Sequence, residues 1–143
     1  MSQLSLENAA RIVDAALEHA QTLKLKPLTV AVLDAGGHLV AFKRQDRSGI
    51  LRPDIAQGKA WGALGMGIGG RALAERAKEA PAFFVALASA SGGRVFPVAG
   101  GVLIKSGGDE IVGAVGISGD HPENDEACAI YAIEQAGLTA QPG

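Results

Sequence analysis

The sequence predicts an α+β fold in which helices pack against an antiparallel sheet. Its 143 residues are about the length of one domain, so we expect a single domain over residues 1–143. Two pairs of strand-like segments are each joined by a short glycine-containing turn, and helical patterns precede, separate and follow them. Strands joined by hairpins pair antiparallel, whereas a doubly wound parallel sheet requires a helical crossover between successive strands.

The first predicted element is an amphipathic helix, and a β-hairpin follows it. Apolar residues recur at three- and four-residue steps over residues 5–23, and Ser5 is a suitable N-cap. Apolar and β-branched residues then predict strands at 28–33 and 38–43. The connecting residues 34–37 end in two glycines, which tolerate the positive φ of a tight turn.

Helical patterns fill the middle of the chain. Pro53 suits the first turn of a helix. The glycine cluster at 65–70 has the letters G-x-G-x-x-G, but a helix rather than a strand precedes it. We therefore interpret this cluster as a helix terminator and not as a dinucleotide-binding turn. Two short helices are predicted next, at 71–79 and 82–90.

A second hairpin is predicted in the last third of the chain. Two apolar runs, at 95–105 and 110–117, flank the turn-forming residues 106–109. Pro97 cannot donate a hydrogen bond to a neighbouring strand, and Gly100-Gly101 favours a bend. We expect these residues to kink the first strand of the hairpin.

The last predicted helix begins at Pro122 and ends at Gly137. It carries apolar residues on two nearly opposite sides, and we expect the second side to contact another layer or another chain. One side holds Cys128, Tyr131 and Ala132, and the other holds Ile130 and Ile133.

Charge and cysteine content exclude several classes of protein. The net charge is −2 and only six residues are aromatic, so the chain lacks the basic surface and the stacking residues of a nucleic-acid-binding protein. The longest segment without charge, residues 80–93, is shorter than the ~20 residues of a membrane-spanning helix. The single cysteine, Cys128, cannot form an intramolecular disulfide, and no secretory signal pattern opens the chain. We therefore expect a cytoplasmic protein.

Small and apolar residues predict self-association. Hydrophobic residues make up 48% of the chain, with 26 alanines and 20 glycines. One small core does not easily bury that much apolar surface, and small side chains let backbones approach closely. We expect a homo-oligomer, with the alanine-rich segment 82–90 and the last helix at its interfaces.

Polar clusters supply the candidate sites. The acidic run at 120–126 suits the positive end of a helix dipole better than a metal, so we expect no metal site. His19 is the imidazole best placed for a cofactor against the first helix, and Cys128 is a second candidate ligand. A cationic cluster follows the first hairpin and would form a carboxylate-binding cavity if it folded over the bend at Phe96, Pro97, Gly100 and Gly101. This cluster comprises Arg44, Arg47, Arg52 and Lys59.

The chain also resembles the HbpS-like, or GlcG-like, family of haem-degrading proteins, which also occurs as the C-terminal domain of PduO-type corrinoid adenosyltransferases. The resemblance runs in order along nearly the whole chain. Its segments are 31–42 (AVLDAGGHLVAF), 54–56 (DIA) with 59–60 (KA), 96–102 (FPVAGGV), 112–119 (VGAVGISG) and 125–127 (DEA). It implies a profilin-like or PAS-like fold with a five-stranded antiparallel sheet, assembled as a dimer, tetramer or octamer.

The resemblance leads to three functional hypotheses. The first is a small-ligand-binding protein that takes haem or another tetrapyrrole as cofactor, with His19 or Cys128 on the iron. In this hypothesis cationic side chains pair with the propionates, and other residues line the pocket. The cations are Arg44, Arg52 and Lys59, and the lining includes Trp61, Phe96, Pro97, Gly100 and Gly101.

The second hypothesis is an enzyme or accessory protein acting on a small organic acid in a glycolate-type or aromatic catabolic pathway. Lys59 and the arginines would hold the carboxylate, and Asp54 or Asp125 would move a proton. The third hypothesis is a non-catalytic oligomeric scaffold.

Overall fold

A five-stranded antiparallel sheet forms the centre of the computed structural model, which describes residues 3–143. The strand order is β2-β1-β4-β3-β5, so strands from the two halves of the chain meet where β1 pairs with β4. The strands are β1 (Thr29–Asp34), β2 (Leu39–Arg44), β3 (Gly101–Lys105), β4 (Ile111–Ser118) and β5 (Thr139–Gln141). This architecture confirms the predicted fold class.

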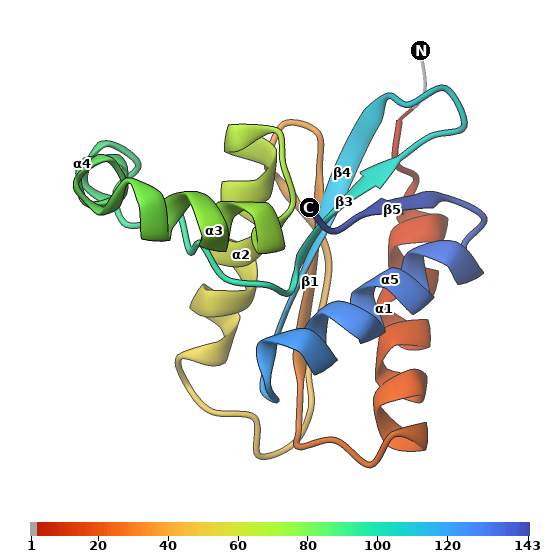
Figure 1. Cartoon of the computed structure of the whole chain (residues 1–143). Coiled ribbons are helices and arrows are strands. Elements are labelled where there is room, and N and C mark those ends of the chain that lie inside the picture. The colour runs from red at the N-terminus through yellow and green to blue at the C-terminus, as the bar shows by residue number, and fades with distance from the viewer. Residues whose placement is uncertain (1–2) are drawn as a thin grey trace.

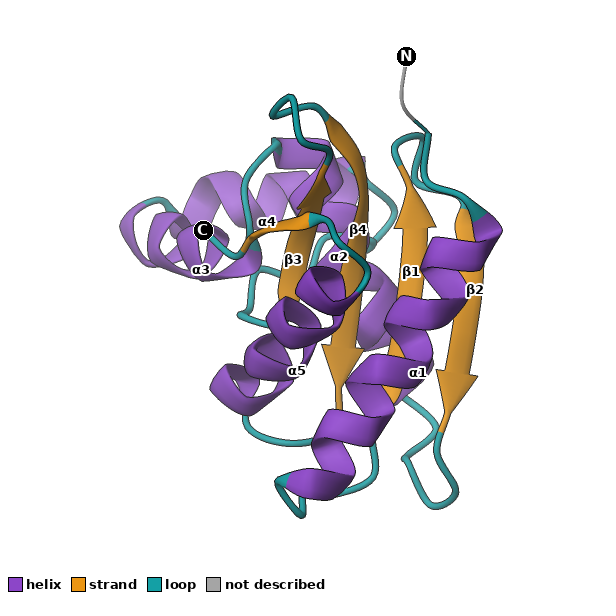
Figure 2. Cartoon of the chain, turned by 90° about the vertical axis from the view of Figure 1, so that its right-hand side faces the viewer, coloured by secondary structure: helices purple, strands orange, loops and turns teal. Residues whose placement is uncertain are grey.

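Helices cover both faces of the sheet. α1 and α5 lie side by side on one face, and α2 lies on the other (Figure 2). α3 and α4 continue from α2 and extend away from the sheet (Figure 1). The helices are α1 (Leu6–Thr22), α2 (Arg52–Met66), α3 (Gly70–Glu79), α4 (Pro81–Ala90) and α5 (Pro122–Gln135).

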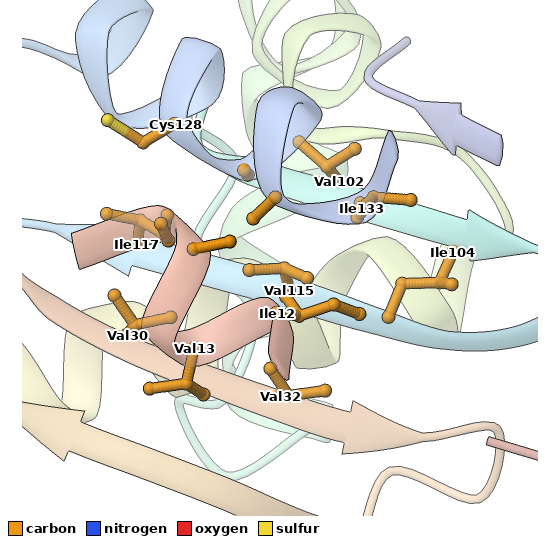
Figure 3. Packing of buried hydrophobic residues seen from close by; sticks show 14 of the residues in the cluster. Ile12, Val13, Val30, Val32, Val102, Ile104, Val115, Ile117, Cys128 and Ile133 are labelled. Atoms are coloured by element: carbon orange, nitrogen blue, oxygen red, sulfur yellow. The ribbon is translucent and has the colours of Figure 1, made fainter. Parts of the chain in front are cut away.

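The larger part of the core lies between the sheet and the α1–α5 layer (Figure 3). Alternate residues of β4 point to opposite faces, as the two-residue period of a strand requires. Val115 and Ile117 pack with Ile12 of α1 and Ile133 of α5, all fully buried, while Ala114 faces α2. Burying an aliphatic side chain of this size contributes about 1.5–3 kcal/mol. The α1–α5 face therefore holds the fold together.

Glycine lets α2 approach the central strand closely. A Cβ on Gly116 of β4 would overlap the carbonyl oxygen of Ala56 in α2, and a Cβ on Gly101 of β3 would overlap the carbonyl of Lys59. With no side chain between them, the helix backbone rests directly on the strands. This contact fixes the position of every side chain on α2.

The predicted helices and the first hairpin are confirmed to within one or two residues. Ser5 caps α1 by accepting a hydrogen bond from the backbone N–H of Asn8. Gly67, with φ of 71°, ends α2 in the left-handed conformation. The glycine cluster thus joins two helices, as predicted, and no strand lies directly before it in this described part of the chain.

The predicted strand at 95–105 is wrong over its first half. Residues 95–100 form an irregular segment, and only 101–105 pair with β4. Pro97 has no N–H to donate, and the φ of 115° at Gly100 turns the chain out of the sheet. Instead of bending the predicted strand, these residues end it, and the strand begins only at Gly101. The short strand β5, which pairs with β3, was outside the elements predicted from the residues.

The predicted division of the last helix into two opposite apolar sides is wrong for Ile133. Ile133 and Cys128 belong to the same buried cluster, because α5 lies against α1 as well as against β3, β4 and β5. Ile130 packs partly against this cluster, and Tyr131 is 37% exposed. The second apolar side of α5 is therefore covered by the chain's own core.

α4 is apolar and exposed. None of its ten residues, all within the described part of the chain, is buried, and Phe83 and Val85 are 54% and 74% exposed. Across the described residues 3–143, no helix combines the length and apolar character needed to cross a membrane.

Candidate functional site

Lys59 and Asp125 form a buried ion pair at one end of the sheet. Lys59 Nζ lies 3.3 Å from Asp125 Oδ2 and donates a hydrogen bond of 2.9 Å to the carbonyl oxygen of Ile117. The two side chains are 4% and 1% exposed. Because Lys59 comes from α2, Asp125 from α5 and Ile117 from β4, the pair joins both helix layers around the end of the central strand.

Burial shifts the pKa values of both partners toward neutrality. Desolvation lowers the pKa of Lys59, and the neighbouring carboxylate of Asp125 opposes that shift. Desolvation raises the pKa of Asp125 to about 6, against the opposing effect of Lys59. The structure thus brings together Lys59, predicted to hold a carboxylate, and Asp125, predicted to move a proton. It places them in a solvent-excluded contact, where their first effect is on stability.

Asp120, in the loop before α5, is held by hydrogen bonds. Asp120 accepts hydrogen bonds from the Asn124 side chain and from the backbone N–H groups of Lys26 and His121. These three donors lower the pKa of Asp120 to about 2. The backbone N–H of Asp120 in turn donates to Asp125 Oδ1, so the loop holds the buried carboxylate in place.

The cationic cluster does not converge on one cavity. Arg52 donates a hydrogen bond to the Ser118 hydroxyl, and Arg44 donates to the carbonyl oxygen of Ser48. Arg44 is exposed at the end of β2, whereas Lys59 is buried. These cations share one end of the sheet but take different partners.

The bend at 96–101 packs on α2 beside Lys59. The backbone N–H of Phe96 donates to the carbonyl oxygen of Gly58, and a Cβ on Gly100 would lie 2.9 Å from Lys59 Nζ. Phe96 is 38% exposed, and Pro97 is half-buried. The cavity formed beside this bend, however, has a different lining from the one predicted.

This cavity has a volume of about 520 Å³ and lies on the α2 side of the sheet. It contains two of the predicted residues, Asp54 and Trp61, and one that sequence reasoning missed, Arg94. The Arg94 guanidinium lies 4.0 Å from the centre of the Trp61 ring. Arg94 follows Gly92 and Gly93 in a loop, and its residue type and spacing did not indicate the contact with Trp61. The complete lining is Leu33, Gly37, Asp54, Gln57, Gly58, Trp61, Gly92, Gly93 and Arg94.

His19 lies on the opposite side of the sheet, where α1 meets α5. Its imidazole is half-buried and stacks on Tyr131, with ring centroids 4.1 Å apart and an angle of 8° between the rings. Among the described residues, nothing forms a hydrogen bond with its ring nitrogens. Tyr131, the only tyrosine in the sequence, fixes the plane of the ring and was not predicted as a site residue.

Cys128 is a buried thiol inside the core. Its residue is fully buried, and desolvation, followed by the nearby Asp125 and Asp120 carboxylates, raises its pKa to about 11. A thiolate, the form that binds iron, is disfavoured there. Of the two predicted ligands, His19 is the accessible one.

Both a protein family and a single relative match nearly the whole chain. Residues 4–134 match the protein family described as Haem degrading protein HbpS-like. The corrinoid adenosyltransferase PduO of Salmonella typhimurium is 30% identical over 130 residues, or 91% of this chain. The chain spans 38% of the length of that relative.

Solved structures agree in fold over nearly the whole chain. The PduOC:heme complex superposes with a TM-score of 0.86 at 28% identity, covering 96% of this chain and 97% of that one. A double mutant of HbpS from Streptomyces reticuli gives 0.81 at 26% identity, covering 94% and 88%. The Klebsiella pneumoniae protein ORFY gives 0.85 at 23% identity, covering 96% and 93%, a likeness of fold alone.

Proposed function

Because the chain belongs to the HbpS-like family of haem-degrading proteins, we propose that it binds haem or a related tetrapyrrole, with His19 as the ligand of the iron. The similarity to the PduOC structure solved with heme supports this choice of ligand class. A bound haem would supply redox and oxygen chemistry at its iron. The residues of the chain would bind and orient it.

The observation that carries the proposal is the stacked, unbonded imidazole of His19. A neutral imidazole binds iron through a ring nitrogen whose lone pair is free. Contact with Tyr131 holds the ring of His19 in one plane, and no hydrogen bond from the described residues occupies either nitrogen. The donor type and its accessibility therefore fit a residue that would bind the iron of haem.

The three predicted cations all have partners within the chain. Lys59 is buried with Asp125, and Arg52 is engaged with Ser118. Arg44 pairs with Thr29 in the sheet and donates to the carbonyl oxygen of Ser48, whereas its neighbour Lys43 reaches Asp14 of α1. The support for the proposal therefore comes from His19 and from the family, and not from these cations.

Titration of haemin into the purified protein tests the proposal. Binding is expected to shift the Soret band, and His19→Ala should remove that shift while leaving the circular dichroism spectrum unchanged. His38→Ala is the matched control, because His38 is an exposed imidazole on the β1–β2 turn that interacts with Asp34. Absence of a Soret shift in the parent, or an unchanged shift in the His19 variant, would refute His19 ligation.

A further inference from the structure

The cavity on the α2 side is a second candidate site, separated from His19 by the sheet. Its volume of about 520 Å³ lies within the ~300–1,000 Å³ of small-molecule sites. It is formed by the first half of α2, the β1–β2 turn and the loop after α4. None of the contacts that support haem binding lies in it, so the two sites can be tested separately.

Arg94 presents an oriented guanidinium to this cavity. The guanidinium stacks on Trp61 at 4.0 Å, and its Nε donates a hydrogen bond of 2.8 Å to the carbonyl oxygen of Ser91. In the described part of the chain, no carboxylate forms an ion pair with it. The two terminal nitrogens are left to form the paired hydrogen bonds that a carboxylate accepts.

Asp54 brings the opposite charge to the same cavity. It lies in the first turn of α2, is exposed, and has no ion-pair partner among the described residues, Arg94 included. Gln57, one turn further along, donates its amide N–H to the carbonyl oxygen of Pro53, so the amide oxygen remains an acceptor. Asp54 and Gln57 therefore supply hydrogen-bond acceptors and a negative charge, whereas Arg94 supplies hydrogen-bond donors and a positive charge.

Apolar groups and bare backbone form the rest of the lining. Trp61 and Leu33 line the cavity, and Gly37, with φ of 84°, comes so close that a Cβ there would lie 3.0 Å from Trp61 Nε1. The glycines at 92 and 93 have φ of 69° and 79° and carry no side chain into the cavity. A ligand with an apolar body fits this lining.

We propose that this cavity binds a small zwitterion, an amino acid or a related amino carboxylate with an apolar side chain. Its carboxylate pairs with Arg94, its ammonium group is held by Asp54 and the Gln57 amide oxygen, and its side chain lies against Trp61 and Leu33. A simple carboxylate would leave Asp54 unpaired, and a simple amine would leave Arg94 unpaired. The unpaired opposite charges thus select a ligand that carries both.

The tryptophan supplies a direct readout. Trp61 is the only tryptophan of the chain, so its fluorescence in the haem-free protein reports occupancy of this cavity. A matched ligand series is L-leucine, 2-hydroxy-4-methylpentanoate, 4-methylpentanoate and 3-methylbutylamine, which share an apolar body and differ in their charged groups. Calorimetry provides the affinities independently of Trp61.

L-leucine is expected to bind at least about tenfold more tightly than the three analogues, since each analogue lacks one charge-assisted contact. Asp54→Asn should remove the preference for leucine over the hydroxy acid. Arg94→Gln should abolish binding of every ligand with a carboxylate, whereas the surface variant Arg76→Gln on α3 should bind like the parent.

Two results would overturn the proposal. One is equal affinity for all four compounds, which would show that the charges do not select the ligand. The other is the absence of binding by the folded parent protein up to millimolar leucine. Neither result bears on the Soret titration, so failure of this site is distinguishable from failure of the haem proposal.

Discussion

At the scale of single residues, the buried Lys59–Asp125 pair has the largest consequence for stability. Replacing Lys59 by methionine leaves the Asp125 carboxylate buried without its counter-ion and removes the hydrogen bond to the carbonyl oxygen of Ile117. We expect a loss of about 3–5 kcal/mol in the free energy of unfolding, measured by urea denaturation. The double variant Lys59→Met/Asp125→Leu should recover most of that loss, because no charge is then left buried.

Lys78→Met is the control for this prediction. Lys78 pairs with Glu75 at 3.3 Å, but both side chains are largely exposed, so the change is expected to cost less than about 1 kcal/mol. A loss of the same small size in Lys59→Met would show that the buried pair does not hold α2 to α5.

Asp120 predicts a component of acid sensitivity. Its pKa is about 2 in the folded protein and 3.8 ordinarily, so between these values the unfolded chain binds the proton more tightly. The stabilisation is therefore complete above about pH 4 and is lost as the pH falls toward 2. Asp120→Asn should flatten the dependence of stability on pH in this range, compared with Asp46→Asn, which replaces an exposed carboxyl that has no ion-pair partner among the described residues. Parallel pH profiles of parent and Asp120→Asn would contradict the assignment.

Sequence patterns identified several residues of the candidate sites, but not the residues that contact them. His19 and Asp54 were predicted from residue type and from their elements, and Trp61 was predicted from the resemblance; each lies at a candidate site. Tyr131 and Arg94 were missed because their roles depend on contacts with residues 112 and 33 positions away along the chain. Lys59 was predicted to meet a ligand, yet its counter-ion lies 66 positions further on, which periodicity cannot reveal.

At the scale of elements, the contact between α2 and β4 requires a glycine, Gly116, which has no side chain. Gly116→Ala would place a Cβ against the carbonyl oxygen of Ala56, a backbone atom that cannot move without displacing the helix. We expect a loss of about 3 kcal/mol or more in the free energy of unfolding. Gly107→Ala is the matched control, because a Cβ on Gly107 meets nothing within 4 Å. Equal stability of the two variants would exclude direct backbone packing of α2 on β4.

Elements with a clear period were predictable, and those determined by tertiary pairing were not. α1 and the first hairpin follow the spacing of apolar residues and the glycines at the turn. β5 has only three residues, Thr139–Gln141, and exists because the edge of β3 is available for pairing. Residues 95–100 have the composition of a strand, but α2 binds the backbone there through Gly58 and Phe96, so the sheet does not.

At the scale of the whole molecule, α4 predicts self-association. We expect light scattering at micromolar concentration to give a mass several times the 14.5 kDa of one chain. Phe83→Glu/Val85→Glu should lower that mass while the circular dichroism spectrum stays unchanged, because neither residue is buried within the chain. The same change at Ile50, which is 92% exposed in a loop, is the control. A monomeric parent would refute assembly, and an undiminished mass of the double variant would refute the role of α4.

The exposure of α4 also determines where the native chain opens most easily. A helix whose ten residues are all accessible gives up little buried surface when it unravels, so its amides should exchange with deuterium far sooner than those of β4, which lie at the centre of the sheet. If neighbouring subunits cover α4, dilution uncovers it. Amide exchange in α4 should then accelerate as the protein is diluted, while exchange in β4 keeps its rate. The protection of the α4 amides from exchange would thus report the fraction of the protein that is assembled.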